Sequence, residues 1–335
     1  MTRPGTGHRI VTSAPTSSDE APTAPCANAS GIGPPLGGHV PDRGIAAGPH
    51  RRAGGVAPVA SEPGPAAGRA LPDGSGSDVR IARFSLGDQV AYGVVEGSHG
   101  EEVLTVITAH PFAPIELTEV RVPLADVRLL APVLPSKIVA IGKNYADHVQ
   151  EMGGQAPEAP LMFLKPSTSV IGPDDPIVLP RQSAEVHHEA ELAVVIGRLC
   201  KDVPLERVHE GGLGYTCAND VTARDVQRGD GQWSLAKGFD TFCPLGPWLS
   251  TEVDPGDLAI QCAVDGEVRQ LGRTSQMIHG VAELVAYVSQ HMTLLPGDVI
   301  LTGTPAGVGP IHAGESVTVG IDDVGRLTNP VVAEA

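Results

Sequence analysis

The sequence predicts an α+β, strand-dominated fold, in which a small β-rich domain precedes a larger mixed one. Short extended segments outnumber helical ones, and the two kinds do not alternate regularly along the chain. This pattern argues against a doubly wound sheet and against a TIM barrel. Hydrophobic alternation begins abruptly at Val79, and Pro132 and Pro135 mark the boundary between the two domains.

Residues 1–78 differ in composition from the rest of the chain. They are rich in Pro, Gly and Ala, and they contain no lysine and no Phe, Tyr or Trp. Such a segment cannot bury enough apolar surface to offset the entropy lost on ordering it. We therefore expect residues 1–78 to form a disordered tail.

Residues 79–131 are predicted to form the small β-rich domain. The Gly87-Asp88 pair, flanked by alternating apolar residues, indicates a hairpin turn. The strands expected here are Val79–Leu86, Val90–Val95, Val103–Thr108 and Glu119–Pro123.

Residues 136–332 are predicted to form the larger, catalytic domain. Met277, Val281, Leu284, Val285 and Val288 recur at helical spacing and predict one amphipathic helix. Shorter helical segments are expected over Asn144–Met152 and Pro204–Glu210. The expected strands are Lys137–Ile141, Ile177–Leu179, Glu189–Ile196, Val299–Thr302 and Ser316–Ile321.

Composition excludes several classes of protein. The formal net charge is −16 without a Lys/Arg cluster, which argues against nucleic-acid binding. No apolar run is long enough to span a bilayer, and no apolar segment follows Arg3 or Arg9 as in a signal peptide. The five cysteines contain no CxxC pair, so reduced thiols and a cytoplasmic location are expected.

The segment from His187 to Ile196 carries the strongest chemical pattern. On a strand, Glu189 and Glu191 point to the same face, about 6.6 Å apart along it. The apolar run that follows favours burial, and two buried carboxylates repel each other unless a cation lies between them. A divalent ion such as Mg²⁺ suits oxygen ligands. The alternative to a metal site is an acidic strand edge that faces the solvent. His187 lies on the same face as the two glutamates and could be a further metal ligand through its imidazole, or a stacked or hydrogen-bonded histidine.

A second pattern begins at Asp220, which ends an extended stretch and can present its carboxylate to a site. Arg224 and Gln227 are three residues apart and share a face if the chain is helical there. An arginine beside an amide donor suits a substrate carboxylate. A helix cap at Asp220 followed by surface polar residues is equally compatible with the sequence.

Three further groups are candidates for the site. On a helix His148 and Glu151 are neighbours, and a carboxylate can orient an imidazole that acts as a base; a surface ion pair is the alternative. Lys165 and Lys237 lie in apolar stretches of the sequence. Each is either a cation that binds a substrate anion or a lysine at the protein surface. The glycine-rich segment around Thr304 lacks the spacing of a phosphate-binding loop.

Seven segments together resemble the fumarylacetoacetate hydrolase family, in the family's order and across about residues 137–330. They are Ile141-Gly-Lys-Asn-Tyr-Ala-Asp-His148, Phe163-Leu-Lys-Pro-Ser-Thr168, His188-Glu-Ala-Glu-Leu192, Asn219-Asp-Val-Thr-Ala-Arg-Asp225, Leu235-Ala-Lys-Gly-Phe239, Thr274-Ser-Gln-Met-Ile278 and Leu301-Thr-Gly-Thr-Pro305. The resemblance is strongest to short bacterial members described as 2-hydroxyhepta-2,4-diene-1,7-dioate isomerases, whose relatives act as acylpyruvate hydrolases or oxaloacetate decarboxylases.

The resemblance implies a mixed β-roll, a homodimer and a divalent metal ion, Mg²⁺ or Mn²⁺. It also assigns a role to each candidate residue. Its implied metal ligands are Glu189, Glu191 and Asp220, its implied catalytic residues are His148, Glu151 and Lys237, and its implied substrate-binding or oxyanion-stabilising residues are Arg224, Gln227, Lys237, Thr304 and Lys165.

Family substrates carry a 2-oxo or 2-enol carboxylate, and a bound metal stabilises the enolate that forms when a bond at C3 breaks. Hydrolysis of a C–C bond in an acylpyruvate, a 1,3-proton shift and decarboxylation share that enolate. Because an acid one turn from the base suits water activation, we expect hydrolysis first, isomerisation second and oxaloacetate decarboxylation third. An inactive binding or scaffold protein with the same fold is the non-enzyme alternative.

Overall fold

The computed structural model describes residues 79–335, except residues 99, 213 and 230. All of them belong to one compact unit. The tail expected over residues 1–78 lies outside the described residues. Within the described part, no helix is both long and apolar enough to cross a membrane.

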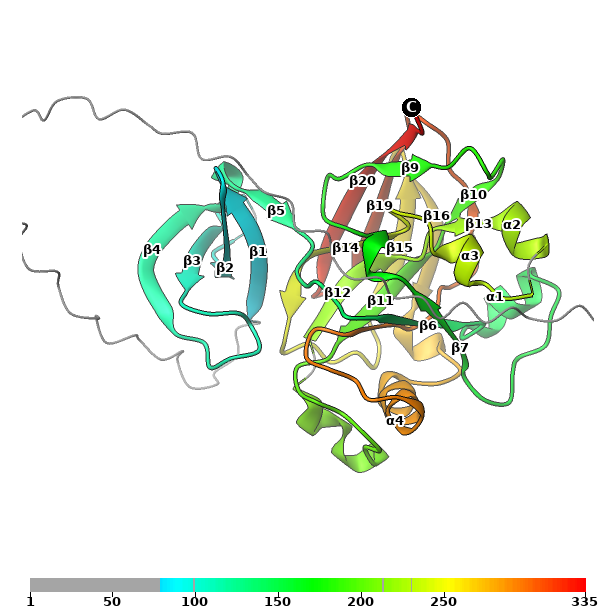
Figure 1. Cartoon of the computed structure of the whole chain (residues 1–335), viewed down its shortest axis with the longest axis horizontal. Coiled ribbons are helices and arrows are strands. Elements are labelled where there is room, and N and C mark those ends of the chain that lie inside the picture. The colour runs from blue at the N-terminus through cyan, green and yellow to red at the C-terminus, as the bar shows by residue number, and fades with distance from the viewer. Residues whose placement is uncertain (1–78, 99, 213, 230) are drawn as a thin grey trace, which may run out of the picture. The chain divides into compact units, whose positions relative to one another are not determined.

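The first strands form an antiparallel meander (Figure 1), as the alternation predicts. Gly87 adopts φ 59° in the turn between the first two strands, a conformation that glycine takes without steric cost. Phe84 and Leu104 are buried in the apolar cluster of this meander. Its elements are β1 (Arg80–Leu86), β2 (Gln89–Glu96), β3 (Val103–Ile107), β4 (Leu117–Pro123), the 3₁₀ helix η1 (Leu124–Asp126) and β5 (Arg128–Leu130).

These strands continue into the largest sheet of the described chain, whose order is β4-β3-β2-β1-β14-β12-β11-β17-β6-β7. β5 pairs with β1, and β8 pairs with β14. Every residue of the central strand β11, from Ala190 to Val195, is buried. The strand is therefore covered on both faces. The other members are β6 (Ile138–Gly142), β7 (Leu161–Lys165), β8 (Val170–Ile171), β11 (Ala190–Val195), β12 (Gly214–Asn219), β14 (Cys243–Ser250) and β17 (Val299–Leu301).

A second sheet, of order β16-β15-β19-β20-β9, packs against the first. Leu192 and Val194 of β11 share one apolar cluster with Ile260 and Val319 of the second sheet. This cluster is the main core of the described chain and supports β11 from one side. The strands of the second sheet are β9 (Ile177–Leu179), β15 (Ala259–Val264), β16 (Glu267–Arg273), β19 (Ser316–Ile321) and β20 (Gly325–Ala333).

The predicted strand Glu189–Ile196 begins one residue later, at Ala190, because the chain changes sheets at Glu189. The N–H of Glu189 donates to the Asn219 side chain at 2.9 Å, and its carbonyl accepts from the N–H of Asp220 at 2.8 Å. The preceding strand belongs to a small three-stranded sheet made of β10 (Val186–His188), β13 (Thr222–Ala223) and β18 (Gly309–Pro310).

The amphipathic helix predicted before Leu295 is confirmed as α4, which buries Leu284, Val285 and Val288. Met277, counted in the same pattern, lies outside it, directly after the 3₁₀ helix η4. The helical segment expected after Pro204 is present as the 3₁₀ helix η3, which ends before Gly212 at φ 59° and contacts α4. The remaining helices are short. The helical elements are α1 (Ala146–Glu151), η2 (Ser167–Ser169), η3 (Leu205–Gly211), α2 (Arg224–Gly229), α3 (Ser234–Lys237), η4 (Thr274–Gln276) and α4 (Val281–His291).

A buried carboxylate joins the starts of β6 and β17. Asp298 accepts hydrogen bonds from the Ser136 hydroxyl at 2.6 Å and the Leu295 N–H at 2.7 Å, and it forms an ion pair with Lys137. Burial raises the pKa of Asp298, but the hydrogen bonds from Lys137, Ser136 and Leu295 outweigh it and hold the pKa below its usual value. The ionised form therefore stabilises the folded state.

We expect Asp298→Asn to lower the free energy of unfolding at pH 7 by about 1–3 kcal/mol, the usual cost of breaking a buried charge-assisted contact. Because the folded-state pKa is depressed, this stabilisation is complete above about pH 4 and is lost as the pH falls through the folded-state value. Urea unfolding across pH 7 to pH 3 measures the difference, with exposed Asp126→Asn as control. An equal deficit at both pH values would contradict the account.

Candidate active site

Three buried carboxylates meet where β11 begins and β12 ends. Glu189 precedes β11, Glu191 is its second residue, and Asp220 follows β12. The antiparallel register pairs Ala190 with Asn219, so the two strand ends lie side by side. Each of the three offers a carboxylate oxygen, and these oxygens lie within 4.8 Å of one another. Glu189 and Glu191 are both buried and lie in one cluster, to which Asp220 also belongs.

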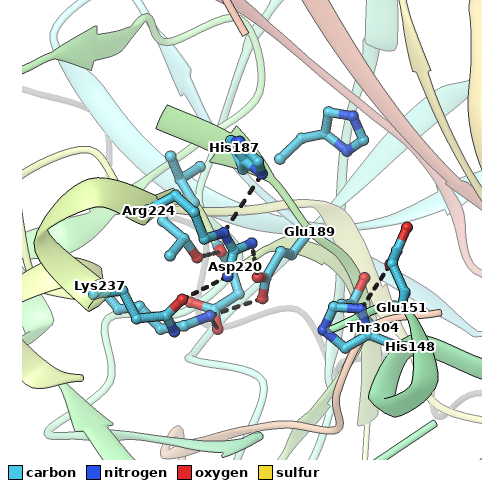
Figure 2. Close-up of polar contacts among 12 residues, drawn as sticks. His148, Glu151, His187, Glu189, Asp220, Arg224, Lys237 and Thr304 are labelled. Atoms are coloured by element: carbon cyan, nitrogen blue, oxygen red, sulfur yellow. Dashed lines mark hydrogen bonds and ion pairs between the residues drawn. The ribbon is translucent and has the colours of Figure 1, made fainter. Parts of the chain in front are cut away.

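Three cations surround this cluster, and Figure 2 shows two of them, Arg224 and Lys237. Arg224 donates to Glu189 at 2.5 Å, and the Lys237 ammonium bridges Glu189 at 2.7 Å and Asp220 at 2.5 Å. Lys165 donates to the other oxygen of Asp220 at 2.5 Å. Each cation is itself buried, so these contacts are little screened by water. Two of the three carboxylates are therefore neutralised by side chains of the protein.

The pKa values of the cluster follow from these pairings. Burial raises the pKa of Glu189, but the charges of Lys237 and Arg224 outweigh it, so the net pKa lies below the usual value. Burial lowers the pKa of Lys237, and the carboxylates of Asp220 and Glu189 more than reverse that effect. Burial and the nearby Asp220 charge both raise the pKa of Glu191 well above its ordinary value.

Glu191 shows that the cluster fits a divalent ion. Among the residues that the structure describes, no Lys or Arg forms an ion pair with it, and the Gly303 N–H donates to one of its oxygens at 2.6 Å. A third carboxylate in this position remains ionised when a further positive charge is bound. A set of three carboxylate oxygens is the donor chemistry that Mg²⁺ and Mn²⁺ prefer.

His148 and Glu151 form the pair expected on a helix. Both lie on α1, and the His148 Nδ1 is 3.1 Å from the Glu151 carboxylate. Glu151 also accepts a hydrogen bond from the Gly307 N–H at 3.0 Å, which fixes its orientation. His148 lines the same pocket as the carboxylate cluster. Figure 2 shows this pair on the side of Glu189 away from Lys237 and Arg224.

The remaining substrate-binding candidates occupy different places. Arg224 and Gln227 share a face of α2 and are joined at 2.6 Å, and both line the pocket. Thr304 also lines it and donates to the Ala190 carbonyl at 2.7 Å. Lys165 does not belong to the pocket lining, because its ammonium lies behind Asp220 and also donates to the Phe242 carbonyl.

The imidazole alternative for His187 is not realised in this structure. Its Nε2 lies 3.0 Å from Glu185, and its Nδ1 accepts a hydrogen bond from Arg224 at 3.4 Å. It is not part of the group of clustered ligand atoms. His187 therefore supports Arg224 from outside the carboxylate cluster.

Sequence reasoning assigned no role to five further residues of the pocket wall. A Cβ on Gly142 would lie 2.2 Å from the Trp233 ring, so only glycine allows this indole to cover the pocket. The signal that was available is proximity in sequence, since Ile141 ends a predicted strand and Gly142 and Lys143 lie between that strand and His148. The five are Ile141, Gly142, Lys143, Met152 and Trp233.

Gln270 is a further residue to which sequence reasoning assigned no role, and it does not line the pocket. Its carbonyl oxygen accepts from His188 at 2.9 Å and from the Ala190 N–H at 3.0 Å. Its amide nitrogen donates to Thr304 at 2.7 Å and to the Pro305 carbonyl at 2.8 Å. This one buried amide therefore ties β16 to the strand break at Glu189 and to the Thr304 loop.

Both domains of the chain are similar to known proteins. Residues 137–332 match the family model for the fumarylacetoacetate (FAA) hydrolase C-terminal region, and residues 79–132 match the Rv2993c-like N-terminal model. The chain is similar to a crystal structure of 5-carboxymethyl-2-hydroxymuconate delta-isomerase from Mycobacterium smegmatis, with 55% identity and a TM-score of 0.72, over 76% of this chain and 100% of that one.

Two other relatives differ in their described activity. Oxaloacetate tautomerase Fahd2a of Rattus norvegicus is 44% identical over 245 residues, which cover 70% of this chain and 77% of that protein. Maleylpyruvate hydrolase from Sphingobium sp. SYK-6, solved with manganese(II) ion and pyruvate, is 34% identical with a TM-score of 0.62, over 76% of this chain and 100% of that one. With a family model that covers more than half of its length, the chain belongs to the fumarylacetoacetate hydrolase family of enzymes.

Proposed function

We propose that this protein is a divalent-metal-dependent enzyme that moves a proton at C3 of a small 2-oxo or 2-hydroxy-dienoic acid. The observation that carries the proposal is that His148, paired with Glu151, lines the same pocket as three clustered carboxylates. A proton shift needs one oriented base and positive charge near the enolate, and this pocket contains the groups for both.

Glu189, Glu191 and Asp220 would hold the metal ion, for which Mg²⁺ and Mn²⁺ are the candidates. When bound, the ion would supply the positive charge that stabilises an enolate. The manganese(II) ion in the related maleylpyruvate hydrolase structure supports the same assignment.

The protein side chains perform the proton transfer. With its Nδ1 proton donated to Glu151, His148 keeps the unprotonated Nε2 for the substrate. The Gly307 N–H holds Glu151 in place, so the imidazole keeps one tautomer and one orientation. Gln227 lines the pocket and is our candidate for contacts to the 2-oxo acid group. Thr304, the other candidate, also lines the pocket, but its hydroxyl already donates to the Ala190 carbonyl.

Hydrolysis of a C–C bond in an acylpyruvate is the second candidate. The acid–base pair on α1 can also take a proton from water, and the relative that hydrolyses maleylpyruvate supports this reaction. Hydrolysis further requires free donors for a distal oxyanion. Arg224 and Lys237, which the sequence offered for that role, are bound to Glu189 and Asp220. We therefore place the proton shift first, hydrolysis second and oxaloacetate decarboxylation third.

One further property of the protein is carried over from the family resemblance alone. We infer that the chain functions as a homodimer. The non-enzyme alternative, a scaffold of the same fold, predicts no turnover of any 2-oxo acid and is tested by the same assays.

Replacement of the base should separate proton transfer from metal binding. We expect His148→Ala to slow solvent-deuterium exchange at C3 of oxaloacetate by about 10²–10⁴-fold, the usual loss for a general base. Mn²⁺ affinity should stay within about threefold of wild type. The measurement is proton NMR of the substrate in D₂O, with exposed His312→Ala as the control.

The same samples separate the two reactions, because hydrolysis of acetylpyruvate in ¹⁸O-water places the label in the released acid. Exchange at C3 without ¹⁸O incorporation supports the proton shift, and incorporation as fast as exchange would favour hydrolysis. Loss of Mn²⁺ affinity in His148→Ala would make His148 a ligand and contradict its role as the base.

The carboxylate cluster gives a separate prediction for metal binding. Glu189→Gln, Glu191→Gln and Asp220→Asn each remove one ligand charge, and each should raise the Kd for Mn²⁺ at least about tenfold and abolish exchange. Calorimetric titration of the folded variants measures the affinity, with exposed Glu119→Gln in β4 as the control. Wild-type affinity in all three variants would show that the ion binds elsewhere.

A further inference from the structure

Three lysine or arginine side chains line the pocket, and two of them are already paired. Arg224 contacts Glu189 and Gln227, and Lys237 bridges Glu189 and Asp220. Lys143 is the third. Within residues 79–335 as described, the Lys143 ammonium has no hydrogen bond and no ion pair. Its charge is therefore available to a ligand in the pocket.

The backbone at Lys143 is held in a conformation that a lysine adopts rarely. Its φ is 58°, in the left-handed region that disfavours residues with a Cβ. Such strain persists where the surrounding structure determines it, and it gathers at binding and catalytic sites.

Both neighbours of Lys143 fix this conformation. Gly142 ends β6, which is paired on both sides, and lies against Trp233. Asn144 is buried, and its amide donates to the Thr302 carbonyl at 2.8 Å and accepts from the His279 N–H at 2.9 Å. The lysine is thus presented from a rigid strand end rather than from a mobile loop.

The charges around the pocket indicate what this lysine would bind. Four carboxylates belong to the carboxylate cluster and the α1 pair, namely Glu151, Glu189, Glu191 and Asp220. Four cations accompany them, namely Lys143, Lys165, Arg224 and Lys237. These charges balance, so a bound divalent ion leaves two positive charges to be neutralised. A substrate with two carboxylates supplies them.

We propose that Lys143 binds the second carboxylate of the substrate, so that the enzyme selects 2-oxo acids that are dianions. This inference rests on the proposed proton shift at C3 and adds the residue that sets specificity. The ammonium would pair with the carboxylate at the end of the substrate remote from the 2-oxo acid group, beside the wall formed by Met152 and Trp233.

The test compares two acids that differ only in that carboxylate, oxaloacetate and 2-oxobutanoate. Lys143→Met keeps an unbranched side chain of similar length and leaves the backbone strain unchanged, while it removes the charge. We expect Lys143→Met to raise the KM for C3 deuterium exchange of oxaloacetate about 10- to 100-fold, the usual loss for a charge-assisted contact. The kcat for oxaloacetate and both constants for 2-oxobutanoate should stay within about twofold.

Two controls and a binding measurement accompany the kinetics. Lys143→Arg should recover most of the affinity for oxaloacetate, and Lys201→Met, outside the pocket, should behave as wild type. Calorimetric titration of oxaloacetate into His148→Ala and into His148→Ala with Lys143→Met measures the same difference without turnover.

The outcomes distinguish this inference from the proposed function. Exchange of neither acid by the wild type would overturn the proposed proton shift and the inference with it. Exchange of both acids, with Lys143→Met affecting both equally or neither, would overturn the inference about Lys143 alone. A selective loss of oxaloacetate affinity would support both.

Discussion

The burial of three carboxylates whose oxygens lie within 4.8 Å of one another is the constraint on which the rest of the site depends. Charges so placed are tolerated only when each is paired. Arg224, Lys237 and Lys165 meet that requirement for Glu189 and Asp220. Glu191 is left with a backbone N–H and an elevated pKa, and a bound divalent ion would supply the positive charge next to it.

The architecture produces this arrangement at a single point, the strand break at Glu189. There the chain leaves the three-stranded sheet and enters the largest one, and β12 ends opposite the break. Gln270, from the second sheet, holds the break from behind through the Ala190 N–H. The site is therefore built on strand ends that the main core supports, while the base comes from the short helix α1 on the opposite side of the pocket.

Local pattern predicted the elements whose side chains are periodic, such as α4 and the meander that begins at β1. It also predicted that Glu189 shares a site with Glu191, because a two-residue repeat survives the break between them. The partners of residues that act through distant contacts could not be found in this way. Lys165 reaches Asp220 across 55 positions, and Gln270 meets Ala190 across 80. The packing of the sheets determines which residues these side chains contact, and the spacing of residues along the chain does not predict those contacts.

The central claim is that the carboxylate cluster holds a divalent ion. Anomalous diffraction at the manganese edge, from crystals of the protein grown with Mn²⁺, tests it directly. The account predicts one strong peak in contact with the oxygens of Glu189, Glu191 and Asp220. A cluster without a peak at saturating Mn²⁺ would contradict it.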